Sequence, residues 1–171
     1  ARAIRRASGS ILRVNRSEVT AARAAGRPAA FLDRLALDES RVESIAQGLL
    51  RVAKLSDPVG EVADFSLRPN GLKIRKMRVP LGVIAVIYES RPGVTADAAG
   101  LCLKSGNACL LRGGSEAAKT NALIADALST GLESAGLPAG AVGFVRDTDR
   151  SAVRRLLAFD RLIDLVIPRG G

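Results

Sequence analysis

The sequence predicts an α/β fold, namely a doubly wound parallel sheet that follows a set of N-terminal helices. Residues 82–88 and 108–111 are short runs rich in Val, Ile and Leu, and Gly or Pro lies near their ends. Such runs are typical of strands that are buried on both faces of a sheet. Two more strand-length runs follow, and helical segments separate all four. This alternation predicts a parallel sheet with right-handed crossovers.

Residues 1–55 are predicted to be helical. The apolar side chains of the first stretch fall near one face, and residues 17–25 are expected to form a second helix that Gly26 ends. Asp38 precedes a longer helix that extends to Leu55 and carries apolar residues at helical spacing. We expect these helices to pack against the rest of the chain without a chemical role.

Residues 56–79 are predicted to form a linker and a hairpin. The pair Asn70-Gly71 is the strongest hairpin signal, because both residues accept the positive φ angles of a tight turn. Residues 72–79 alternate apolar and basic side chains, which indicates a half-exposed strand. Its basic face is expected to contact solvent or another subunit of a homo-oligomer.

Residues 80–171 are predicted to form the β-α-β-α-β-α-β unit. The first crossover helix is expected at 94–104, with Thr95 and Asp97 placed to cap or charge its start. The later elements are expected as a helix at 117–135, a strand at 141–145, a helix that ends at Phe159 and a buried strand at 162–167. The chain stops directly after that strand, so we expect a truncated domain.

The composition excludes several classes of function. The chain of 171 residues has a net charge of +9 and no His, so Ser-His-Asp and Cys-His catalysis are excluded and no metal site is expected. Cys102 and Cys109 are too few for a disulfide framework and are expected in the core. No apolar run approaches the roughly 18 to 20 residues of a membrane span, and no secretory signal is present. We therefore expect a cytoplasmic protein without a membrane partner.

Polar, turn-rich clusters follow the first two predicted strands, at residues 88–93 and 112–116. Ligands of open α/β sheets bind outside the carboxyl ends of the strands, where helix N-termini also attract anions. Gly113 and Gly114 let the backbone approach a phosphate, and Arg112 offers a guanidinium group to it. The sequence therefore predicts a nucleotide-binding unit at this edge, although no complete GxGxxG motif is present.

Residues 80–117, PLGVIAVIYESRPGVTADAAGLCLKSGNACLLRGGSEA, are very similar to the core of the γ-glutamyl phosphate reductase family, a branch of the aldehyde dehydrogenase superfamily. Residues 57–60 and 163–171 resemble further segments of that family. The resemblance implies an aldehyde-dehydrogenase-like cofactor domain and the reduction of γ-glutamyl phosphate to glutamate semialdehyde with NADPH, in proline biosynthesis. One departure is Gly93, which stands where the family usually has Asn after Arg-Pro.

The resemblance also implies roles for individual residues. Arg112 and Ser115 are expected at the 2′-phosphate of NADP, and Gly113 and Gly114 belong to the turn that holds the adenosine ribose. Arg91 is expected to bind the acyl phosphate of the substrate or its developing oxyanion. The other expected cofactor contacts are Tyr88, Glu89 and Ser90 near the nicotinamide, and Gly170 and Gly171 near the pyrophosphate.

The same resemblance places the nucleophilic cysteine in a separate domain, beyond Gly171, so no catalytic residue is expected in this chain. On this view residues 1–171 are the N-terminal part of an NADP-binding domain. Two alternatives stay open. One is a non-catalytic module of the same fold that binds a nucleotide or a partner chain. The other is a basic nucleic-acid-binding domain, which is disfavoured because the chain has four Phe, one Tyr and no Trp for base stacking.

Overall fold

The computed structural model of the chain describes residues 1–170, and Gly171 lies outside the described residues. Within that part, four parallel strands form one sheet in the order β5-β4-β3-β6. The strands are β3 (Val83–Tyr88), β4 (Ala108–Arg112), β5 (Val142–Phe144) and β6 (Leu165–Arg169). The first three lie where the apolar runs predicted them, β6 begins and ends a few residues later than the predicted 162–167, and the parallel α/β sheet is confirmed.

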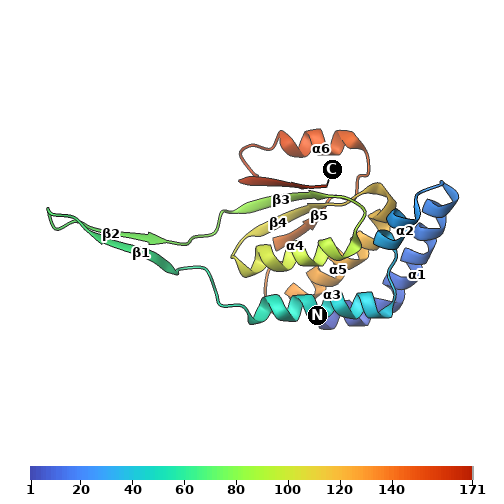
Figure 1. The fold of residues 1–171 in the computed structure, drawn as a ribbon, viewed down its shortest axis with the longest axis horizontal. Coiled ribbons are helices and arrows are strands. Elements are labelled where there is room, and N and C mark those ends of the chain that lie inside the picture. The colour runs from blue at the N-terminus through green and yellow to red at the C-terminus, as the bar shows by residue number, and fades with distance from the viewer. Residues whose placement is uncertain (171) are drawn as a thin grey trace.

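The winding of the sheet reverses at β3. Helices α4 (Pro92–Lys104) and α5 (Ala118–Glu133) cover one face, whereas α6 (Arg150–Leu157) lies on the other (Figure 1). Strand β4 is on one side of β3 and β6 on the other, so the doubly wound arrangement is also confirmed. Burial of the last strand was predicted wrongly. Leu165 and Ile167 remain 39% and 40% exposed, because β6 is an edge strand in the described chain and pairs only with β3 there.

Two side chains fix the positions of the neighbours of β3. The side chain of Asn107, just before β4, accepts hydrogen bonds from the backbone N–H groups of Leu81 and Gly82, at 2.6 and 2.9 Å. Asp164, just before β6, accepts one from Val83 N at 2.8 Å. Its carboxylate lies against Gly82, where a built Cβ would be 2.0 Å from Asp164 Oδ2 and where φ is 125°. Only glycine fits there, and these contacts set the register of both parallel pairs.

Three helices, α1 (Arg2–Ala24), α2 (Ala29–Leu35) and α3 (Glu39–Lys54), precede the sheet. The predicted break near Ser17 is wrong, since α1 is continuous. Glu18 does not start a helix of its own. It accepts hydrogen bonds from the backbone N–H groups of Lys119 and Thr120 and so caps α5. Asp38 precedes α3 as predicted, and it caps the helix by accepting a hydrogen bond from Arg41 N at 2.7 Å.

The helices add a second layer beneath α4 and α5 (Figure 1). Helix α1 packs against α5, and α3 packs against α4. A buried Asn15 joins α1 to the end of α2. Its Nδ2 donates to Leu35 O at 3.0 Å, and its Oδ1 accepts from Leu37 N at 2.7 Å. Helix α2 is therefore held at the edge of the sheet where the strands β3, β4 and β6 end (Figure 1).

The hairpin of β1 (Val62–Leu67) and β2 (Lys73–Met77) projects away from the body of the protein (Figure 1). Its turn differs from the predicted one, because only Gly71 has a positive φ, of 82°. Pro69 precedes Asn70, whose side chain accepts a hydrogen bond from Leu72 N, and this favours a type I turn followed by a glycine. Strand β2 is exposed on both faces rather than half-exposed, since no layer of the described chain covers it.

Helix α4 begins two residues earlier than predicted, because Pro92 is preorganised for the first helical turn. Thr95 therefore does not cap the helix. It is buried, and its hydroxyl bonds to that of Tyr88 at 2.7 Å. Gly93 faces α3, where a built Cβ would lie 3.7 Å from Ile45. Cys102 and Cys109 are free and buried, as predicted. No helix of residues 1–170 is both long and apolar enough to cross a membrane.

Candidate functional site

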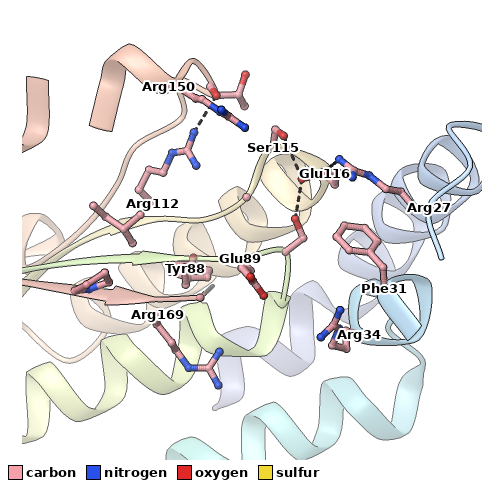
Figure 2. Close-up of a pocket in the computed structure, with 16 residues that line it drawn as sticks. Arg27, Phe31, Arg34, Tyr88, Glu89, Arg112, Ser115, Glu116, Arg150 and Arg169 are labelled. Atoms are coloured by element: carbon pink, nitrogen blue, oxygen red, sulfur yellow. Dashed lines mark hydrogen bonds and ion pairs between the residues drawn. The ribbon is translucent and has the colours of Figure 1, made fainter. Parts of the chain in front are cut away.

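A pocket of about 550 Å³ lies at the carboxyl edge of the sheet, where β3, β4 and β6 end. The winding reverses at β3, so the turns after β3 and β4 and the end of β6 surround one space. In open α/β sheets this switch point is where ligands bind. Helix α2 and the connection to α6 complete the walls (Figure 2).

Most residues that the sequence singled out line this pocket. The turn after β3 and the turn after β4 face each other across it, and the end of β6 closes one side (Figure 2). The predicted residues in the lining are Tyr88, Glu89, Ser90, Arg112, Gly114, Ser115 and Gly170. Residues as far apart in the sequence as Tyr88 and Gly170 are thus brought together by the parallel strands.

Two predicted residues are placed differently, and a third is not among the described residues. Gly113 lies beneath the lining, where a built Cβ would be 2.1 Å from the amide nitrogen of buried Asn121 and 3.1 Å from the Tyr88 ring. Arg91 is the N-cap residue of α4 and is not part of the lining, and its Nε is buried without a hydrogen-bond partner in residues 1–170. Gly171 lies outside the described residues.

Tyr88 contributes to the shape of the pocket rather than to its chemistry. Burial raises the pKa of the Tyr88 phenol far above its ordinary value, although the hydrogen bond with Thr95 acts in the opposite direction. The ring is only 3% exposed. Tyr88 is therefore a neutral, fixed side chain, and its hydroxyl is already bonded to Thr95.

Glu116 connects the two turns, and sequence reasoning assigned it no role. Its Oε2 accepts hydrogen bonds from the hydroxyls of Ser90 at 2.9 Å and Ser115 at 3.1 Å, and its Oε1 pairs with Arg27. The turns touch at Gly114, where a built Cβ would lie 2.3 Å from Ser90 Oγ and 2.9 Å from Ser90 N. Burial raises the pKa of Glu116, but hydrogen bonds and the Arg27 charge lower it more, so the net pKa is below its ordinary value.

Because the Glu116 carboxylate is ionised, the stability that it gives to the contact between the turns after β3 and β4 should decrease at acidic pH. A carboxylate whose pKa is lowered by folding stabilises the folded protein at pH values above its unfolded-state pKa, which is near 4.5. That stabilisation is lost as the pH falls through the folded-state pKa. We expect Glu116→Gln to lower the free energy of unfolding at neutral pH by about 1 kcal/mol, since the group is partly exposed. Denaturation at several pH values should show the difference from the parent protein shrinking below about pH 4.5.

Glu133→Gln is the matched control, because Glu133 lies at the exposed end of α5 with no ion pair recorded in the described chain. It should change neither the stability nor its pH dependence. A Glu116→Gln protein that keeps the full acid sensitivity of the parent would contradict a stabilising role for the Glu116 carboxylate.

Positive charge dominates the pocket. Among the described lining residues, five are arginines and two are glutamates. Arg112 donates from Nη2 to Thr148 O at 2.9 Å, and its Nε is buried without a partner in the described chain. Arg150 lies close to Arg112 at the same end of the pocket (Figure 2). This excess of guanidinium groups favours an anionic ligand, and phosphate is one of the groups that arginine binds by paired hydrogen bonds.

Sequence reasoning missed the lining residues that come from α2, from the connection before it and from the segment that leads into α6. Arg27, Phe31 and Arg34 come from the α1–α2 connection and α2, and the Arg27 guanidinium lies 5.1 Å from the centre of the Phe31 ring. Thr148 and Arg150 come from the start of α6. No local pattern marks these residues, because their place in the site depends on how the helices pack against the sheet edge.

Known proteins are similar to the chain in both sequence and fold. No protein-family model matches it. The γ-glutamyl phosphate reductase of Sorangium cellulosum (strain So ce56) is 57% identical over 162 residues, which is 95% of this chain and 38% of that protein. The crystal structure of γ-glutamyl phosphate reductase from Thermotoga maritima superimposes with a TM-score of 0.94 and 42% identity, over 99% of this chain and 41% of that one.

The chain is homologous to γ-glutamyl phosphate reductase. It spans about 40% of the length of these reductases. An acetylating aldehyde dehydrogenase from Geobacillus thermoglucosidasius, 19% identical, superimposes with a TM-score of 0.71 over 96% of this chain and 33% of that chain. The fold is therefore shared by γ-glutamyl phosphate reductases and aldehyde dehydrogenases, and the expected resemblance to the reductases and the expected fold are confirmed.

Proposed function

We propose that the chain forms part of the cofactor domain of an NADPH-dependent γ-glutamyl phosphate reductase. The complete protein would reduce γ-glutamyl phosphate to glutamate semialdehyde in the cytoplasm, as a step of proline biosynthesis. The observation that carries this proposal is the arginine-lined pocket at the switch point of the sheet, in a chain homologous to such reductases. NADPH would bind along the turns after β3 and β4.

The residues of the pocket fit an NADP phosphate. The buried Nε of Arg112 needs an acceptor, and the described chain provides none. Ser115 and Arg150 also line the pocket, on the same side as Arg112 in Figure 2, so a 2′-phosphate there could be bound by three side chains. The turn at Gly114 approaches Ser90 closely enough to exclude any side chain, so a residue without a side chain lets the two turns lie side by side at the pocket.

In this proposal NADPH supplies a hydride, and the chain supplies binding and orientation. Ser90 is held by Glu116 at 2.9 Å, so the turn after β3 has a fixed position beside the pocket. Glu89 lines the pocket next to it. Arg91 remains our candidate for the acyl phosphate or its oxyanion, because its buried Nε lacks a partner in residues 1–170.

The proposal can be tested in the reverse direction with the full-length protein. Glutamate semialdehyde, inorganic phosphate and NADP should give γ-glutamyl phosphate and NADPH, which absorbs in the near ultraviolet. The reaction should depend on all three reactants, and omission of phosphate is the control. Nucleotide binding without turnover would instead identify a binding module of the same fold.

A further inference from the structure

A second charged cluster lies on the helical face of the sheet, outside the pocket. Asp97 projects from α4, and Arg51 from α3 is near it. A Cβ built on Gly48 of α3 would lie 3.5 Å from Asp97 Oδ1 and 3.8 Å from Arg51 Nη2. The carboxylate and the guanidinium group therefore both border the bare backbone of Gly48, where the missing side chain leaves space.

The two charges do not neutralise each other. Within residues 1–170, neither Asp97 nor Arg51 makes an ion pair within 4 Å or a side-chain hydrogen bond. Burial raises the pKa of Asp97 above its ordinary value, although Arg169 and Arg51 act to lower it. Asp97 is thus a partly exposed carboxylate with no direct partner among residues 1–170, although the charges of Arg169 and Arg51 act on it.

Arg169 links this cluster to the pocket. It lies at the end of β6 and belongs to the lining of the pocket. In Figure 2 its guanidinium group points away from Arg112 and toward α4, and its charge acts on Asp97. The cluster of Asp97, Arg51 and Arg169 therefore adjoins the candidate cofactor pocket across the last strand.

A free carboxylate between guanidinium groups is complementary to an amino acid, which carries an ammonium and a carboxylate on one carbon. We propose that this cluster binds the α-amino acid end of the substrate, with the α-ammonium at Asp97 and the α-carboxylate at Arg51 and Arg169. The proposal rests on the reductase function proposed above and assigns its substrate specificity. Asp97 is then the residue that distinguishes an amino acid from the same acid without its amino group.

The test compares two aldehydes in the full-length protein. Glutamate semialdehyde carries the α-amino group, and glutarate semialdehyde lacks it. We expect Asp97→Asn to raise the KM for glutamate semialdehyde at least about tenfold, because a charge-assisted hydrogen bond is lost. The kcat and the KM for NADP should stay near their original values, and the reaction of glutarate semialdehyde should be unchanged.

Gly48→Ala gives a second variant that is not expected to impair folding. Its methyl group would occupy the space between Asp97 and Arg51 at ordinary contact distances. Alanine is favoured over glycine inside a helix, so the melting temperature should stay the same or rise while the KM for glutamate semialdehyde increases several-fold. Gly9→Ala is the matched control, since Gly9 lies in α1 with nothing within 4 Å of a built Cβ.

A binding measurement separates this inference from the reductase function. Calorimetry should show that the full-length protein binds glutamate more tightly than glutarate, and that Asp97→Asn removes the difference. If neither aldehyde is turned over, the reductase function fails and the glutamate-glutarate comparison decides this inference alone. A parent protein without a preference for glutamate, or an Asp97→Asn protein that keeps it, would overturn the assignment.

Discussion

Replacing Arg112 with alanine is expected to reduce the preference of the full-length protein for NADPH over NADH by about tenfold or more. The guanidinium group is anchored to Thr148 O at 2.9 Å, and its buried Nε has no partner in the described chain. A charge-assisted contact with a phosphate contributes about 1.5 to 3 kcal/mol, and about 1.4 kcal/mol corresponds to a factor of ten. The ratio of kcat/KM for the two cofactors measures the effect.

Arg13→Ala is a suitable control, because Arg13 is an exposed residue of α1 that lies outside the pocket lining. It should leave both kcat/KM values unchanged. If Arg112→Ala weakens NADPH and NADH equally, Arg112 binds a part that the two cofactors share. If neither value changes, Arg112 has no role in cofactor binding.

The second large effect concerns catalysis by the chain alone. We expect residues 1–171 to give no detectable turnover of an acyl phosphate, nor of glutamate semialdehyde with NADP and phosphate. The reaction needs a nucleophilic thiol, and the two thiols of this chain are buried. A hydrogen bond with Cys102 and burial both raise the pKa of Cys109, which keeps that thiol protonated and unreactive.

Replacing Cys102 and Cys109 together with alanine in the full-length protein separates a structural role from a catalytic one. Each side chain is small, so the double variant should fold with a modest loss of stability and keep most of its activity. Circular dichroism checks the fold before the assay. A folded but inactive double variant, or turnover by residues 1–171 alone, would show that one of these cysteines is the nucleophile.

The sheet was the most predictable part of the protein. Strands at 82–88 and 108–111 follow from short apolar runs, bounded by Gly and Pro, that are typical of a sheet covered on both faces, and β3 and β4 lie there. The carboxyl edge was predictable for the same reason, because parallel strands carry their following turns to one side. Ser90, Arg112 and Ser115 could therefore be placed together before the structure was known.

The errors arise where tertiary contacts override a local pattern. Thr is a residue type that often caps helices, and Thr95 was therefore a candidate. However, Pro92 starts the helix earlier, and the Thr95 hydroxyl bonds to that of Tyr88. Glu18 lies where the sequence predicted the start of a second helix, but its side chain caps α5, which begins about 100 residues later. Glu116 lies within residues 80–117, which carry the resemblance to the reductases. Its role depends on contacts with Ser90 and Arg27, and these contacts cannot be predicted from sequence spacing.

The Asp164 contact with the start of β3 has a consequence for how the pocket is assembled. The Asn107 contact that aligns β4 spans 25 residues, whereas the Asp164 contact that aligns β6 spans 81. Closing a longer loop costs more chain entropy, so the pairing of β6 is the slower of the two to form. The candidate pocket needs both pairings, so we expect it to become complete only when β6 joins the described sheet.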